Sequence, residues 1–255
     1  MNPFLDEYVR KEAQFYGLET PIKEGRLSVI SHGVSGLTPC LFHNEIRVVS
    51  TKLLNIPAMF LDNSKLIFSL TPFHLQGYYL PIQRATGRVL CLGLGMGYFV
   101  LRASQKPEVT EVVVVEQSQE IIDFFKRHFN TRSETRKIRI VHGDTYSTET
   151  HLRVGKDFDF CLCSIYPVLY SDESIRDVPT FMDVYGVKQY HFFGMERLIM
   201  ECMGCGLLRR YDVSIHLREF INLWKTMGHR FQPILKERIL RAFSLLALRK
   251  NLLQW

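Results

Sequence analysis

A segment with glycine at every second position, Gly93-Leu94-Gly95-Met96-Gly97, constrains the fold of this chain more than any other feature. It lies between an apolar run at 88–92 and a helical pattern at 98–104. Glycines between a strand and a helix let the backbone turn sharply and let a ligand approach closely. The same residues also fit a tight connection that binds nothing, so this loop alone does not assign a cofactor site.

Strand and helix patterns alternate on both sides of the glycine loop. We expect strands at 88–92, 109–116, 137–142 and 158–164, and helices at 98–104 and 119–129. Strands that alternate with helices at this spacing indicate βαβ units. Their apolar runs are typical of strands covered on both faces. The sequence therefore predicts an α/β protein with a doubly wound, mostly parallel sheet.

The residues before the loop have a different pattern. A helical pattern over 1–25 gives way to short strand-like segments over 26–70, with Asp62-Asn63-Ser64 as the clearest hairpin turn. Thr71 and Pro72 then predict the start of a helix that runs to about Arg84. We therefore expect an N-terminal helix and β-rich subdomain at 1–70, a core at 71–189 and a mainly helical C-terminal region at 190–255.

Composition limits the class of protein. Of the 255 residues, 46% are hydrophobic and 23% are charged, which is typical of a folded globular chain. No apolar run reaches the roughly 20 residues that span a bilayer, and the first residues are too charged for a signal peptide. Six cysteines without a framework pattern suit a reducing compartment. We expect a cytoplasmic protein without a membrane partner, and leave homo-oligomerisation open.

The formal net charge of +6 is spread along the chain. It permits a nucleic-acid partner, but no recognised nucleic-acid motif accompanies it. Cys202 and Cys205 have the spacing of a metal or redox pair. Because no second pair or suitably spaced histidine is found, we expect no metal site.

Two carboxylates follow predicted strands near the glycine loop. Glu116 closes the strand at 109–116, about 20 residues past the glycines, where an acidic side chain can accept both hydroxyls of a ribose. Asp144 follows the next strand and could accept a hydrogen bond from an adenine amino group. The alternatives are a solvated strand-end carboxylate at Glu116 and a plain Gly-Asp turn at Asp144.

This ordered set resembles class I S-adenosylmethionine-dependent methyltransferases, and within them the branch similar to polyamine aminopropyltransferases (spermidine synthases). The resemblance covers roughly 55–170 and includes Phe60-Leu61-Asp62-Asn63 and Tyr78-Tyr79. It implies a Rossmann-like methyltransferase fold that binds S-adenosyl-L-methionine. The cofactor-binding residues that we predict on this basis are Gly93, Leu94, Gly95 and Gly97 for the methionine moiety, Glu116 for the ribose and Asp144 for the adenine, with Gln117, Thr145 and Ser164 beside them.

A NAD-binding Rossmann domain is the main alternative for the fold. It usually has Gly-x-Gly-x-x-Gly, whereas the third glycine here comes one residue earlier. The spacing therefore favours S-adenosylmethionine.

The end of the fourth strand is where the reacting group should lie. Aminopropyltransferases resemble one another in an Asp-Ser-x-Asp-like segment here, whereas this chain has Ser164 at the first acidic position and no carboxylate until Asp172 and Glu173. An amine nucleophile must lose a proton before it attacks, so the missing acid disfavours polyamine synthesis. Tyr166 is our candidate catalytic residue, with simple packing as its alternative.

Three hypotheses about function follow. The first is an S-adenosylmethionine-dependent methyltransferase that acts on a small molecule or another unidentified acceptor, since methyl transfer needs little beyond in-line placement. The second is an aminopropyltransferase-like enzyme. The third is a catalytically silent binding or assembly protein that retains the fold.

Overall fold

In the computed structural model of the protein, the residues described are 6–34, 37–38, 46–47, 54–166 and 172–194. Its helices are α1 (Asp6–Tyr16), α2 (Pro72–Arg84), α3 (Tyr98–Ser104), α4 (Gln119–Phe129), the 3-10 helix η1 (Ser133–Lys137), α5 (Thr148–Val154) and α6 (Asp172–Tyr185). Its strands are β1 (Ile22–Glu24), β2 (Leu27–Val34), β3 (Leu37–Thr38), β4 (Ile46–Arg47), β5 (Leu54–Leu61), β6 (Lys65–Ser69), β7 (Gly87–Leu92), β8 (Val109–Glu116), β9 (Ile138–His142), β10 (Phe158–Cys163) and β11 (Val187–Phe192).

The second half of the described chain forms a parallel sheet. Its strand order is β11-β10-β7-β8-β9, and every neighbouring pair is parallel. Counted along the chain from β7, this is the order 5-4-1-2-3, which matches the doubly wound arrangement of Rossmann-like folds. The predicted fold class is therefore confirmed, and the predicted strands and helices of this region agree with the observed ones to within one residue.

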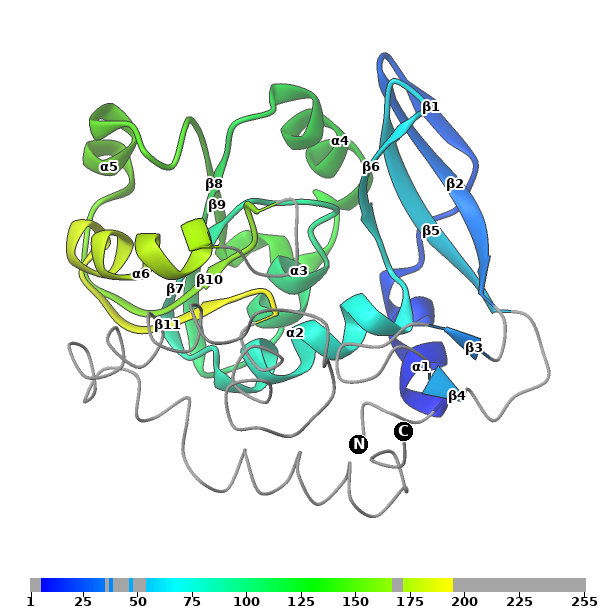
Figure 1. Ribbon diagram of the computed structural model, residues 1–255, viewed down its shortest axis with the longest axis horizontal. Coiled ribbons are helices and arrows are strands. Elements are labelled where there is room, and N and C mark those ends of the chain that lie inside the picture. Colours follow the sequence, from blue (N-terminus) through cyan, green and yellow to red (C-terminus); the bar gives the residue numbers. More distant parts are fainter. Residues whose placement is uncertain (1–5, 35–36, 39–45, 48–53, 167–171, 195–255) are drawn as a thin grey trace.

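Both faces of the parallel sheet are covered (Figure 1). One core cluster joins sheet residues such as Val112 to buried side chains of α1, α2, α3 and α4. A second cluster joins Val113 to buried side chains of α5 and α6. Because successive strand residues point to opposite faces, the run of buried valines at 112–115 supplies both cores. This explains why residues 112–115 of β8 are all apolar.

An antiparallel sheet, β1-β2-β5-β6, stands beside the parallel one (Figure 1). The β5–β6 hairpin turns at Asp62 and Asn63, which both have positive φ (52° and 56°). Asparagine and aspartate adopt this conformation more readily than most residues. The predicted hairpin and the β-rich N-terminal subdomain are confirmed, as is the α2 start, where the Thr71 side chain accepts from the His74 amide.

Three expectations about the chain ends have different outcomes. The helical prediction over 1–25 is wrong beyond Tyr16, because Gly17 adopts a left-handed φ of +57° that ends the helix and the chain then enters β1. The expected boundary at 189/190 falls inside β11. The expected C-terminal helices lie at 195–255, outside the described residues, and the domain bounds stay predictions. No described helix is long and apolar enough to cross a membrane.

Candidate cofactor site

The glycine loop lies at the carboxyl ends of four strands that backbone hydrogen bonds hold together. The Gly93 amide donates to the Val115 carbonyl at 2.8 Å, and the Ser164 amide donates to the Leu92 carbonyl at 2.8 Å. The Gly143 amide donates to the Glu116 carbonyl at 3.0 Å. The first residues after β7, β8, β9 and β10 therefore meet at one edge of the sheet, which brings the predicted cofactor residues together.

Two of the loop glycines are required for different reasons. Gly93 has φ of +89°, and a Cβ added there would lie 2.8 Å from the Ser164 carbonyl oxygen, so the backbone of the next strand excludes a side chain. Gly97 has φ of +78°, and its Cβ would lie 2.2 Å from the Phe125 ring. Gly93 thus permits contact between two strand ends, whereas Gly97 permits close packing of α3 against α4.

Glu116 is the most constrained of the predicted site residues. One carboxylate oxygen accepts from the Leu94 amide at 2.9 Å, and the other accepts from the Ser118 amide at 2.8 Å. The residue is only 7% exposed, which rules out the solvated strand-end alternative. Since a carboxylate offers about four lone-pair sites, each oxygen keeps one for a ligand hydroxyl. Glu116 therefore both fixes the glycine loop and retains acceptor capacity.

The residues after β8 and β9 have more ordinary roles. Asp144 is exposed, and one of its oxygens accepts from the Tyr146 amide at 3.0 Å, as the turn alternative predicts. Gln117 is exposed, and its carbonyl lies 3.1 Å from Nε2 of His142. Thr145 is buried, and its carbonyl accepts from the Tyr185 hydroxyl at 3.0 Å. Asp144 stands at the expected edge, where its carboxylate is accessible to an adenine.

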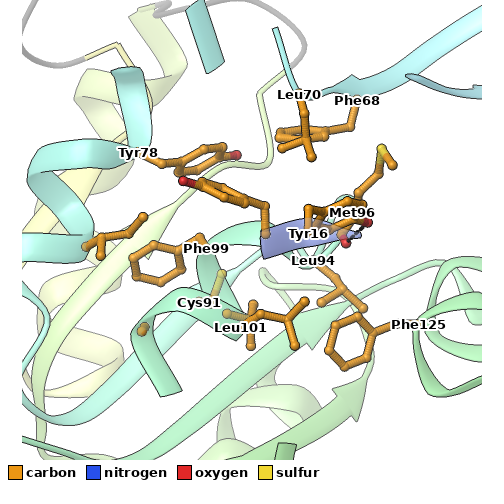
Figure 2. Close-up of a cluster of buried hydrophobic side chains, with 14 of the residues drawn as sticks. Tyr16, Phe68, Leu70, Tyr78, Cys91, Leu94, Met96, Phe99, Leu101 and Phe125 are labelled. Carbon is orange, nitrogen blue, oxygen red and sulfur yellow. Dashed lines mark hydrogen bonds between the residues drawn. The ribbon is translucent and has the colours of Figure 1, made fainter. Parts of the chain in front are cut away.

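Aromatic side chains from β6 and α2 cover the loop on its other side. Phe68 lies 3.5 Å from the position of a Cβ on Gly95, and its ring centroid is 5.8 Å from that of Tyr78. The Tyr78 hydroxyl lies 3.0 Å from Oγ of Ser164. Burial raises the pKa of Tyr78, so this phenol stays protonated at neutral pH. Figure 2 shows Phe68, Tyr78 and Met96 as members of one cluster of buried side chains.

Tyr166, the predicted catalytic residue, contacts an acid that sequence reasoning missed. Its hydroxyl donates to Oδ2 of Asp177 at 2.9 Å, and the Tyr146 hydroxyl donates to the same oxygen at 2.6 Å. Burial, with the adjacent Cys163 and Asp177, raises the pKa of Tyr166. A phenol held protonated can donate a hydrogen bond but cannot serve as a base near neutral pH.

Asp177 lies in α6 rather than at the end of β10. The linear sequence carries no signal for the role of Asp177, because this residue reaches the end of β10 only when α6 packs back over the sheet. Of the acids that the sequence did offer, Glu173 is exposed at the start of α6.

The residues at this edge fit the adenosine part of S-adenosylmethionine. The glycine loop, Glu116 and Asp144 supply close backbone approach, a fixed carboxylate and an accessible carboxylate, respectively. Beside these groups, Phe68 packs near Gly95 of the loop, and the Tyr78 hydroxyl contacts Oγ of Ser164. Among the described residues, no group of three or more His, Cys, Asp or Glu side chains is placed to hold a metal ion, and Cys202 and Cys205 lie outside them.

No protein-family model and no curated protein sequence matches the chain. Solved structures with a similar fold include spermidine synthase from Thermotoga maritima, at 15% identity and a TM-score of 0.33, over 43% of each chain. A methyltransferase from Geobacter sulfurreducens is 14% identical with a TM-score of 0.36, over 48% of this chain and 58% of that one. A precorrin-6y C5,15-methyltransferase from Geobacter metallireducens is 14% identical with a TM-score of 0.34, over 44% and 57%. The matched part is thus less than two thirds of each of these structures, and the likeness concerns the fold alone.

Proposed function

We propose that this chain is an S-adenosylmethionine-dependent methyltransferase with an unidentified acceptor. The observation that carries the proposal is Glu116, a nearly buried carboxylate fixed at the end of β8 by the amides of Leu94 and Ser118. In open α/β sheets, ligands bind beyond the carboxyl ends of the strands. A carboxylate at this place with remaining acceptor capacity suits a pair of ribose hydroxyls.

Each part of the edge has its own task in this proposal. Glu116 orients the ribose, Asp144 accepts from the adenine amino group, and the loop from Gly93 to Gly97 lets the backbone lie close to the ligand. S-adenosylmethionine, when bound, supplies a methyl group on a positively charged sulfur. Phe68 and Tyr78 exclude water from the loop side of the site, so the chain's contribution is mainly placement of the acceptor in line with that methyl group.

Two specific observations support alternatives. Asp177 places a carboxylate near the end of β10, which an aminopropyltransferase-like enzyme needs as a base. Two phenols already donate to Oδ2 of Asp177, so this oxygen is occupied by Tyr146 and Tyr166 rather than free to face an amine. Ser164, which contacts the Tyr78 hydroxyl at 3.0 Å, instead favours a catalytically silent binding protein, because the end of β10 then carries no acid of its own.

Calorimetry with S-adenosylmethionine and S-adenosylhomocysteine tests the proposal directly. We expect saturable heat with both at micromolar to low millimolar concentration, and no heat with either at millimolar ligand would overturn it. Decarboxylated S-adenosylmethionine with putrescine separates the second candidate, which alone releases methylthioadenosine. Binding of either cofactor without turnover on any acceptor, together with a stable partner in a pull-down, would favour the silent protein.

A further inference from the structure

The N-terminal helix contacts the glycine loop through a buried hydrogen bond. Tyr16, in the last turn of α1, donates its hydroxyl to the Met96 carbonyl at 2.6 Å. The Tyr16 side chain is 0% exposed, and Figure 2 shows it beside Met96 within the aromatic cluster. Burial raises the pKa of Tyr16, which keeps its hydroxyl a donor. An element far from the loop in sequence therefore satisfies a carbonyl inside it.

A second contact fixes the same face of α1 to the helix that follows the loop. Glu12 lies four residues before Tyr16 and hence on the same side of the helix. Its carboxylate accepts from the Tyr98 hydroxyl at 2.7 Å and from Nε of Arg102 at 2.6 Å. Glu12 is buried, so its pairing with Arg102 makes the contact costly to break. The first turn of α3 and the loop are thus attached to one helix.

The end of α1 is fixed from the opposite direction as well. Arg132 donates to the Tyr16 carbonyl at 2.5 Å and to the Phe15 carbonyl at 3.2 Å. Two guanidinium groups lie over the Phe15 ring, with the Arg102 carbon 3.8 Å and the Arg132 carbon 5.5 Å from its centroid. Tyr16 is therefore held in place by residues that do not belong to the loop.

The bonded carbonyl lies at the most adaptable point of the loop. Met96 is flanked by Gly95 and Gly97, which have φ of +52° and +78°. Glycine pairs allow several orientations of the peptide groups between them, because no Cβ limits rotation. A hydrogen bond to an immobile, buried phenol selects one of these orientations, since the alternative leaves a buried carbonyl without a partner.

We propose that Tyr16 is a positioning residue for the cofactor loop, and that docking of α1 and occupation of the loop by an adenosyl ligand are thermodynamically coupled. The identity of the ligand in this inference rests on the proposed function, but the positioning of the loop by Tyr16 does not. By linkage, a ligand that binds better to the ordered loop must also stabilise the docked helix by the same factor.

The test compares Tyr16→Phe with Tyr190→Phe, a variant that removes the hydroxyl of another fully buried tyrosine, on β11. S-adenosylhomocysteine is the probe, its affinity is measured by calorimetry, and amide hydrogen exchange is followed in α1 and in the loop. Useful reporters are the amides of Leu94 and Gly97, which donate to Glu116 and to the Leu94 carbonyl.

We expect Tyr16→Phe to weaken binding of the probe by about 5- to 100-fold and to speed exchange at the loop amides by a similar factor. Tyr190→Phe should change both by less than about twofold. In the unsubstituted chain, saturating probe should slow exchange in α1. Tyr98→Phe, which loosens α1 through Glu12 but keeps the Met96 bond, should have a smaller effect on the loop.

Equal affinities for Tyr16→Phe and the unsubstituted chain would overturn the inference, as would equal losses in Tyr16→Phe and Tyr190→Phe. If the unsubstituted chain binds no probe, the proposed function fails, and loop exchange alone decides the positioning role. Unchanged loop exchange in Tyr16→Phe would then reject it. If Tyr16→Phe does not fold, Tyr98→Phe tests the coupling through the Glu12 contact of α1 instead. Unchanged loop exchange together with unchanged affinity in that variant would overturn the coupling.

Discussion

The ends of β8 and β10 lie at the same edge of the sheet but are built in different ways. At β8 the strand ends on Glu116, whose oxygens accept from backbone amides close by in space. At β10 the corresponding position is Ser164, which contacts Tyr78 of α2, and the carboxylate comes from Asp177 of α6. The β8 end is thus set by the backbone, whereas the β10 end depends on the packing of side chains from several elements.

Under the proposed function, this difference separates the end that would bind the adenosine from the end that would face the acceptor. Groups held by backbone amides keep their places without help from the ligand, which suits recognition of an invariant adenosine. Groups held by side-chain packing can vary while the sheet stays the same, which suits an acceptor that differs between proteins of one fold. The four changes below act on one of these ends or on the glycine that lies between them.

The largest effect is expected at Gly93, which follows β7, the strand that lies between β8 and β10. In Gly93→Ala, the new Cβ would lie 2.8 Å from the Ser164 carbonyl at a φ of +89°, so backbone strain and overpacking add. We expect unfolding to become easier by about 2 to 5 kcal/mol in urea titrations. Gly25→Ala is the matched control, because Gly25 also has positive φ (+56°) but no atom within 4 Å, and should cost about 1 to 2 kcal/mol. Equal losses in the two variants would mean that the strand ends are not in close contact.

Glu116→Ala removes the group that defines the β8 end. Affinity for S-adenosylhomocysteine should fall by about 10- to 1000-fold, because charge-assisted hydrogen bonds to the ribose are lost. Unfolding should also become easier by about 1 to 3 kcal/mol, since the Leu94 and Ser118 amides lose their acceptor. The affinity of Glu116→Gln should lie between that of Glu116→Ala and that of the unsubstituted chain.

The control is Glu120→Ala, at an exposed glutamate in the first turn of α4, which should change the affinity by less than about twofold. An unaltered affinity in Glu116→Ala would show that the β8 end does not recognise the ribose, and the proposed division of roles between the two strand ends would fail.

A change of pH should weaken the aromatic cover near the β10 end. His74 stacks on Phe193, and burial lowers its pKa to about 4. The unfolded chain binds a proton at this histidine near pH 6.5, so the contribution is complete above that pH and is lost as the pH falls toward 4. Between pH 6.5 and 5 the free energy of unfolding should fall by about 1 to 2 kcal/mol more than in His74→Gln. Parallel urea-derived pH profiles for the two proteins would show that His74 is not desolvated.

The smallest effects concern the tyrosines that share Asp177. Tyr146 is 52% exposed, so Tyr146→Phe should destabilise the protein by less than about 1 kcal/mol, and Tyr166→Phe by about 1 kcal/mol. Because both hydroxyls donate to one oxygen, the double variant should differ from the sum of the two. Strict additivity in a double-mutant cycle would indicate that Tyr146 and Tyr166 are not coupled through the shared oxygen of Asp177.

The sequence predicts the features that depend on local backbone conformation and misses those that depend on the packing of distant elements. The glycine loop, the strand that ends on Glu116 and the Asp62-Asn63 turn each depend on local conformation or on alternation, and all were predictable. Asp177 and Tyr16 were not, because their roles arise when helices distant in sequence pack against the loop and the strand ends. The burial of Glu116 was also hidden, since the partner amides at Leu94 and Ser118 carry no sequence signal.

The strand order gives the site one property that no side chain controls. From β7 the chain leaves to α3 on one face of the sheet, and from the neighbouring β10 it leaves to α6 on the other. Connections that depart in opposite directions from adjacent strands create a topological switch point, where a crevice forms at the sheet edge. Substitutions at the loop or at α6 can therefore change the side chains around the switch point, but its position is determined by connectivity and should survive in any variant that still folds.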